Sequence, residues 1–119
     1  MATSKLQNDG SINGSVTYGN GVYSSIFKNE IRRTGNVVTV LFSGKIASSI
    51  AGTNGTICTL PELFRPPAAN VRNIYIRGKY GNNSGTWSAS IKGNDGTIQT
   101  VTGASDFTDE IYVDCTFII

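Results

Sequence analysis

The side chains that could carry out chemistry in this 119-residue chain are few, and the missing types are informative. The sequence has no histidine, which excludes Ser-His-Asp and Cys-His nucleophiles and the commonest zinc ligand. Three carboxylates, Asp106, Asp109 and Glu110, lie close together in the segment ASDFTDEI. Such a group could form a glycosidase acid–base pair, hold a cation or accept hydrogen bonds from hydroxyls, and it is also typical of a solvated loop. Because hydrolysis needs a deep cleft and a tuned carboxyl pair, we predict no enzymatic activity, no metal and no cofactor.

Aromatic and cationic side chains suited to saccharide binding occur in two stretches. Tyr75, Arg77 and Lys79 alternate with apolar residues in VRNIYIRGKY and therefore share one strand face. An aromatic ring beside two cations could hold a sugar phosphate, although an ordinary solvated face has the same pattern. Trp87, the only tryptophan, alternates with apolar residues, which favours a core or inter-subunit position over a platform for a sugar ring.

Charge, hydropathy and cysteine spacing exclude several classes of partner. The formal net charge is only +2, and the basic residues are scattered, so we expect no nucleic-acid interface. No apolar run approaches the ~20 residues that a membrane span needs, and we expect no insertion into a membrane. Cys58 and Cys115 form no CxxC pair, and we predict two buried, reduced and unpaired thiols.

Short strands joined by tight turns must position these side chains, because Thr, Ile, Val, Gly, Asn and Ser dominate the composition. Turn signals such as Asn-Gly recur between strand-length runs, and GNDG at 93–96 predicts a hairpin. Apolar residues alternate with polar ones within NVVTVLFSGKI and TWSASIK. The run from Ile111 to Ile119 is apolar to its end and predicts a strand inside the sheet. The sequence therefore predicts an all-β fold, a small antiparallel barrel or sandwich of about seven or eight strands.

All three prolines of the chain lie in the segment LPELFRPP. Proline cannot donate to a strand ladder, and it favours an extended conformation in the residue before it. Pro66 and Pro67 therefore predict a crossover outside the sheet, which Phe64 and Arg65 could pack against one end of the barrel.

The polar residues 1–14, rich in turn formers, indicate a linker or the end of a preceding segment. The series of strand-length runs separated by turn signals begins after them. We expect a single domain at 15–119.

The segment LPELFRPPAANV, followed by a strand, a Gly/Asn-rich turn and a hairpin around GNDGTI, resembles the tip domains of phage tail fibres and baseplate proteins. The nearest likeness is to the receptor-binding head of lactococcal siphophage baseplates. The stretch SVTYGNGVYSSIFKNEIRRTGNVVTVLFSGKI of this chain also resembles the opening pair of strands of that head. The resemblance covers residues 15–119. It implies a trimeric β-barrel head at the tip of the virion tail, joined to the baseplate by an N-terminal neck, that binds host cell-wall saccharide.

The saccharide-binding residues of those heads are not carried over. The heads use a histidine and an aspartate on the first hairpin strand, where this chain has Ser88 and Ser90. A tryptophan on the second hairpin strand falls near Thr100 here, and the final run has no arginine. We therefore expect a shared scaffold with a different ligand site.

Our predicted site gathers polar side chains from two strands, a hairpin and the loop before the last strand. Its members are Tyr75, Arg77, Lys79, Trp87, Ser88, Ser90, Gln99, Asp106 and Asp109. Tyr75 would stack on a sugar ring, the aspartates would accept hydroxyl protons, and a cation would meet any phosphate in the polymer. Two alternatives stay open: a purely structural trimeric module, and a saccharide-degrading tailspike fragment.

Overall fold

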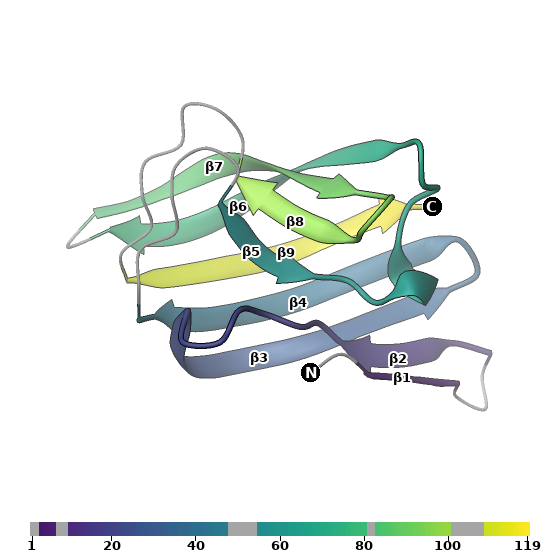
Figure 1. Ribbon diagram of the computed structural model, residues 1–119, viewed down its shortest axis with the longest axis horizontal. Coiled ribbons are helices and arrows are strands. Elements are labelled where there is room, and N and C mark those ends of the chain that lie inside the picture. Colours follow the sequence, from purple (N-terminus) through teal and green to yellow (C-terminus); the bar gives the residue numbers. More distant parts are fainter. Residues whose placement is uncertain (1–2, 7–9, 48–54, 81–82, 101–108) are drawn as a thin grey trace.

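The computed structural model describes residues 3–6, 10–47, 55–80, 83–100 and 109–119, and all of the strands among them belong to one antiparallel sheet (Figure 1). The strands are β1 Thr3–Leu6, β2 Ile12–Ser15, β3 Tyr23–Thr34, β4 Val37–Ile46, β5 Thr56–Thr59, β6 Val71–Tyr80, β7 Asn83–Lys92, β8 Thr97–Thr100 and β9 Glu110–Ile118, with the 3-10 helix η1 Glu62–Phe64 before β6. Their order in the sheet is β1-β2-β3-β4-β9-β6-β7-β8-β5. The predicted all-β class is confirmed, with nine strands in the described parts of the chain where about seven or eight were expected.

The sheet curls until its two ends meet. Thr17, just after β2, donates its N–H to the Thr59 carbonyl at 3.1 Å, and the Thr59 N–H donates back at 2.8 Å. Thr59 belongs to β5, the strand at the opposite edge of the sheet from β1. The result is a half-barrel, with β5 and β8 in front of the central strands β6 and β9 in the view of Figure 1.

Alternating side chains fill the inside of this half-barrel. Val38, Val40 and Phe42 of β4 are fully buried, as their spacing predicted, and Ile111 and Val113 of β9 are buried beside them. The polar residues between them point to the other face of the sheet. A sheet with one face turned to the core and the other to solvent fixes the register of each strand, because a slip of one residue would exchange the two faces.

The proline-rich segment forms the expected crossover outside the sheet, between β5 and β6. Phe64, at the end of η1, is fully buried in the core. The Arg65 Nε–H donates to the Leu60 carbonyl at 2.8 Å, which folds the crossover back on its own start. A second arginine, Arg33 of β3, donates to the Leu63 carbonyl at 2.7 Å. One hydrogen bond within the crossover and one from β3 therefore hold it in place.

Two glycines of the GNDG turn allow this crossover to pack against the β7–β8 hairpin. A Cβ on Gly93 would lie 2.0 Å from the Pro67 carbonyl oxygen, and one on Gly96 would lie 2.4 Å from the Leu60 oxygen. Gly96 also has a φ of +76°, which side-chain-bearing residues rarely adopt. The turn and the crossover interlock through backbone contacts that only glycine permits.

The N-terminal residues expected to be a linker include two strands. β1 pairs with β2, and β2 pairs with β3 through Ile12, Asn13 and Gly14. Their polar sequences, TSKL and INGS, carry too few apolar residues to be recognised as strands. The domain boundary at residue 15 stays a prediction, while the sheet itself extends before it.

The two cysteines are unpaired, as expected. Cys58 is fully buried, and burial, reinforced by the nearby Cys115, raises the pKa of its thiol well above the ordinary range. Burial also raises the pKa of Cys115 to about 11. Within the part of the chain that the structure describes, no helix has the length and apolar character needed to cross a membrane.

Candidate functional site

The face of the sheet that points away from the core, the outer face, carries the polar side chains of the central strands. Residues directly opposite each other on neighbouring strands share a face. Thr86 of β7 lies opposite Arg77 of β6, Arg77 lies opposite Tyr112 of β9, and Tyr112 lies opposite Ser43 of β4. The next row along the strands contains Lys79 in the corresponding position on β6. These rows place cations, hydroxyls and an aromatic ring side by side.

A shallow pocket of about 210 Å³ opens on this face. We call it the Tyr112 pocket; it is lined by Arg77, Gly78, Lys79, Ser84, Gly85, Thr86 and Tyr112. Two of the lining positions are glycines, so that the pocket floor is backbone flanked by polar side chains. Such a surface can place donors and acceptors around a ligand that stays partly in water.

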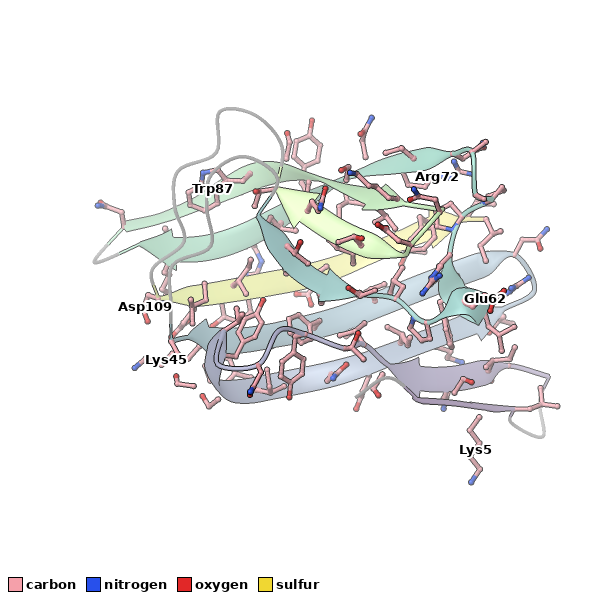
Figure 2. All side chains as sticks on the ribbon, in the orientation of Figure 1. Lys5, Lys45, Glu62, Arg72, Trp87 and Asp109 are labelled. Atoms are coloured by element: carbon pink, nitrogen blue, oxygen red, sulfur yellow. The ribbon has the colours of Figure 1, made fainter. Side chains whose placement is uncertain are left out.

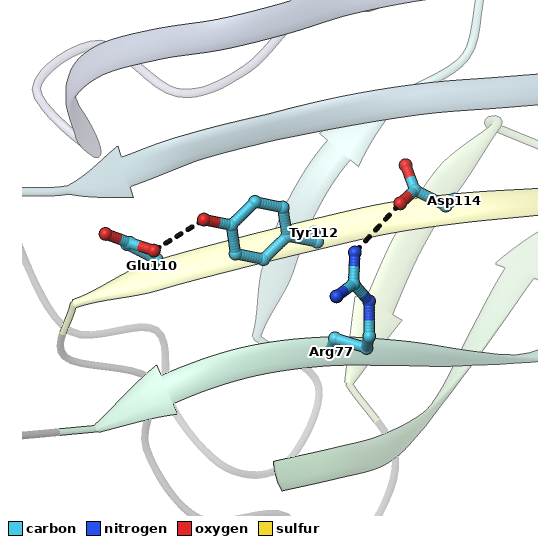
Figure 3. Close-up of polar contacts among 4 residues, drawn as sticks. All are labelled: Arg77, Glu110, Tyr112 and Asp114. Carbon is cyan, nitrogen blue, oxygen red and sulfur yellow. Dashed lines mark hydrogen bonds and ion pairs between the residues drawn. The ribbon is translucent and has the colours of Figure 1, made fainter. Parts of the chain in front are cut away.

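Tyr112 is the centre of a polar network that joins β6 and β9 (Figure 3). The Arg77 guanidinium lies 5.0 Å from the centre of the Tyr112 ring, a cation–π contact, and its Nη2 donates to Asp114 Oδ2 at 3.1 Å. The Tyr112 hydroxyl donates to Glu110 Oε1 at 2.5 Å. Lys79 Nζ lies 3.5 Å from the same Glu110 oxygen. Each side chain is therefore oriented by at least one neighbour.

The hydrogen bond between Tyr112 and Glu110 shifts the acidity of both groups. It is the main cause that lowers the pKa of Glu110, with Lys79 acting in the same direction. The same bond is the main cause that raises the pKa of Tyr112. At neutral pH the pocket therefore holds an ionised carboxylate beside a protonated phenol, one an acceptor and the other a donor.

An aromatic surface extends the pocket toward β3. The Phe27 and Tyr112 ring centres are 6.3 Å apart, with an angle of 34° between the planes. Phe27 occupies an irregularity in the β3–β4 pairing, between Ile26 and Lys28, and its side chain is 51% exposed. Two tilted rings beside carboxylates form a surface on which an apolar ring face could lie while its polar edge meets acceptors.

The structure brings together two of the predicted site residues and places a third nearby. Arg77 and Lys79 line the Tyr112 pocket. Asp109 directly precedes β9, at the end of that strand nearer to the pocket. Its N–H donates to the Lys79 carbonyl at 3.2 Å, and its charge raises the pKa of Tyr112. Figure 2 shows Asp109 at the same end of the molecule as Lys45. Asp106 lies outside the described residues.

The other predicted residues that the structure describes lie elsewhere on the outer face, except Trp87, which faces the core. Tyr75 is 74% exposed and faces outward opposite Ser88, and neither lines the pocket. Ser90 and Gln99 are opposite each other on β7 and β8, both half-buried. Trp87 is half-buried and packs against the core, in agreement with the core position that its alternation favoured. The predicted site is therefore spread over the face, and only part of it converges.

Sequence reasoning missed the pocket residue Tyr112 and two side chains beside the pocket, Phe27 and Asp114, which contact Tyr112 and Arg77 respectively. The apolar final run predicts a strand inside the sheet, and β9 lies there, between β4 and β6; this composition gave no reason to include its side chains in the site. Its alternation carried the missing signal, since Tyr112 and Asp114 stand at every second position between the buried Ile111, Val113 and Phe117. Phe27 had no such signal, because a bulge determines where its ring points.

No group of three or more metal-ligating side chains is found among the described residues. The carboxylates of the pocket are instead engaged by a phenol, a guanidinium and an ammonium group. Comparison of the chain with protein-family models and with curated proteins finds no match.

Proposed function

We propose that this protein is the receptor-binding head of a phage tail, which recognises saccharide of the host cell wall without catalysis during adsorption. The resemblance of residues 15–119 to lactococcal siphophage heads gives the context: a virion tip joined to the baseplate through an N-terminal neck. The observation that carries the proposal is the Tyr112 pocket, where an exposed aromatic surface lies beside acceptors and donors in fixed positions.

A sugar ring would use the two parts of this site differently. Its C–H face would lie on Phe27 and Tyr112, because the aromatic rings offer flat apolar area. Its hydroxyls would donate to Glu110 and Asp114 and accept from Lys79. Asp114 already neutralises Arg77, so this arrangement favours hydroxyl groups over the phosphate that the isolated pair Arg77 and Lys79 had indicated.

Such a shallow site binds weakly, since much of the sugar stays hydrated. We propose that the head is a homotrimer, which would present three copies of the site. Linked copies of a weak site raise the apparent affinity for a polymer by orders of magnitude. The exposed apolar side chains Val37, Val71 and Ile118 support this proposal. Val37 and Ile118 are opposite each other on the outer face, beyond the Tyr112 pocket along β9.

The proposal is tested by binding the protein to purified lactococcal cell walls. We expect Tyr112→Ala to lower the apparent affinity by about tenfold or more, because it removes the ring and the partner of Glu110. Tyr75→Ala is the matched control, since it removes an exposed phenol that does not line the Tyr112 pocket, and its affinity should stay within about twofold. Equal binding by both variants would exclude the Tyr112 pocket as the site.

A second candidate function is a structural trimeric module without a ligand, which the apolar patch of Val37, Val71 and Ile118 favours. It predicts a stable trimer that binds no wall preparation from any strain. A saccharide-degrading role would differ from both by releasing new reducing ends from wall polysaccharide. Binding without release of sugars is the result expected of a receptor-binding head.

A further inference from the structure

The outer face has a second, larger hollow of about 460 Å³. We call it the Leu41 hollow; it spans β2, β3 and β4 and is lined in part by Asn13, Gly14, Glu30, Arg32, Thr39 and Leu41. Asn13 lies opposite Arg32, and Arg32 lies opposite Thr39. The hollow therefore belongs to the same face as the Tyr112 pocket.

The two depressions adjoin each other. Asp114, the partner of Arg77 in the Tyr112 pocket, lies opposite Leu41, and Leu41 lies opposite Glu30. Leu41 and Glu30 both line the second hollow. Asp114 itself lines neither depression, so the pocket and the hollow lie on neighbouring rows of the outer face. Together they cross six consecutive strands, β2-β3-β4-β9-β6-β7. With neighbouring strands ~4.8 Å apart, this path is about 24 Å long.

One polar atom in the Leu41 hollow has no partner. The Asn13 side-chain oxygen is buried and accepts no hydrogen bond. Buried acceptors are nearly always satisfied, and an exception at the wall of a hollow indicates a ligand that carries a donor. A hydroxyl group would meet this need.

Three cations along the path are paired with carboxylates. Lys28 lies 3.8 Å from Glu30, Arg77 lies 3.1 Å from Asp114 and Lys79 lies 3.5 Å from Glu110. A path on which these three cations are already neutralised offers less to an anionic polymer, while carboxylates and hydroxyls remain good partners for neutral hydroxyl groups.

We propose that the Tyr112 pocket and the Leu41 hollow form one continuous groove, which binds several consecutive uncharged sugar units within a polysaccharide chain. A single terminal sugar would fill only one of the two depressions. This inference rests on the proposed saccharide-binding function and adds to it the length and the charge of the segment recognised.

The test uses polysaccharide extracted from lactococcal cell walls and cut by partial acid hydrolysis into fragments of about two and about eight sugar units. Titration calorimetry should show at least about tenfold tighter binding of the longer fragments. The double variant Asn13→Ala/Thr39→Ala should remove most of this gain and leave binding of the short fragments unchanged. The control Thr34→Ala/Asn73→Ala alters exposed residues outside both depressions and should bind as the unmodified protein does.

The outcomes separate this inference from the function on which it rests. Equal affinity for both fragment lengths, or an unaffected double variant, would overturn the extended groove and leave saccharide binding intact. Absence of binding to every fragment and to the intact polysaccharide would overturn both. An uncharged segment also requires that affinity change less than about threefold between about 50 and 500 mM NaCl, and a much steeper loss would overturn the assignment of charge.

Discussion

Tyr112 combines two roles in the outer face. Its ring forms an aromatic surface with Phe27 and carries the Arg77 guanidinium, while its hydroxyl fixes Glu110. Alternation along β6 was enough to predict that Arg77 and Lys79 face solvent together. It could not show that Tyr112 completes their pocket, because that contact joins strands more than 30 residues apart in sequence.

Removing only the hydroxyl group of Tyr112 tests its effect on Glu110. The hydrogen bond stabilises the ionised carboxylate and so lowers the pKa of Glu110. In Tyr112→Phe we therefore expect the pKa of Glu110 to rise toward its ordinary value of 4.5, measured by carbon-13 NMR of the carboxyl groups. Tyr75→Phe is the control and should leave Glu110 unchanged. A Glu110 that titrates identically in all three proteins would contradict the hydrogen bond.

Asp95 gives a pH dependence to stability at the β7–β8 turn. Its carboxylate accepts hydrogen bonds from the Thr97 hydroxyl and from the Thr97 N–H, which lower its pKa below 3.8. A group with a lowered folded-state pKa stabilises the fold at pH values above 3.8, and this contribution disappears as the pH falls through the folded-state pKa. The isosteric Asp95→Asn variant should therefore have a lower Tm than the unmodified protein near pH 7. The two Tm values should converge near pH 2, and a constant difference would contradict this assignment.

At the scale of elements, the crossover and the hairpin turn were each predictable, and their contact was not. Pro66 and Pro67 exclude a sheet position, and the glycines around Asn94 and Asp95 indicate a tight turn. These are local signals. The packing of Gly93 on Pro67 joins segments that no local pattern connects. The same limit explains β1 and β2, whose polar residues form strands only because the edge of β3 is present to pair with them.

The glycine contacts can be separated from backbone strain by a matched pair of variants. Gly96 and Gly35 both have positive φ, +76° and +60°, but only Gly96 is close to other atoms. Gly35→Ala should lower the free energy of unfolding by about 1 kcal/mol through strain alone. Gly96→Ala should cost about 2 kcal/mol more, because its Cβ would meet the Leu60 carbonyl. Urea unfolding measures both, and equal losses would show that the crossover does not pack on the turn.

At the scale of the whole molecule, the alternation of apolar and polar residues predicted an all-β fold and most of its core. It could not predict the order of the strands in the sheet. Three of the eight neighbouring pairs of described strands join strands that are not consecutive in sequence, β4 with β9, β9 with β6 and β8 with β5, and the pattern of apolar residues does not specify these pairs. The curl closed by Thr17 and Thr59 depends on the twist accumulated over the sheet. For the same reason the sequence could not predict which of the candidate site residues lie together, since the outer face gathers residues according to strand order.

Thiol reactivity should report the opening of the half-barrel. Cys58 is fully buried, while Cys115 is half-buried with a pKa of about 11, so both react slowly as thiols near pH 8. In the folded protein we expect a disulfide reagent to modify Cys115 first and Cys58 only upon unfolding. The Cys115→Ser variant leaves one thiol and isolates the slower phase. Two thiols should react in denaturant, and rapid reaction of both in the folded state would contradict the closed core.

Sedimentation equilibrium tests the proposed trimer. We expect a species of three 12.7 kDa chains at micromolar concentration, held in part by Val37, Val71 and Ile118. Ile118→Lys should dissociate it, because a charge in an apolar contact stays unpaired when buried. Leu63→Lys is the control, as Leu63 is an exposed apolar residue of η1 outside this patch. A monomer in the unmodified protein would exclude the trimer.

The position of β9 has a consequence for how the protein can be divided. Residues 1–47 supply β1 to β4 and residues 55–100 supply β5 to β8, and in the sheet β9 lies between these two groups. A chain cut before residue 109 would leave an open slot bordered by the unpaired edges of β4 and β6. A synthetic peptide of residues 109–119, added in trans, should fill that slot and restore the Tyr112 pocket together with the fold. If the proposed saccharide binding holds, the protein would then serve as a split reporter, because association of its two pieces would restore that binding.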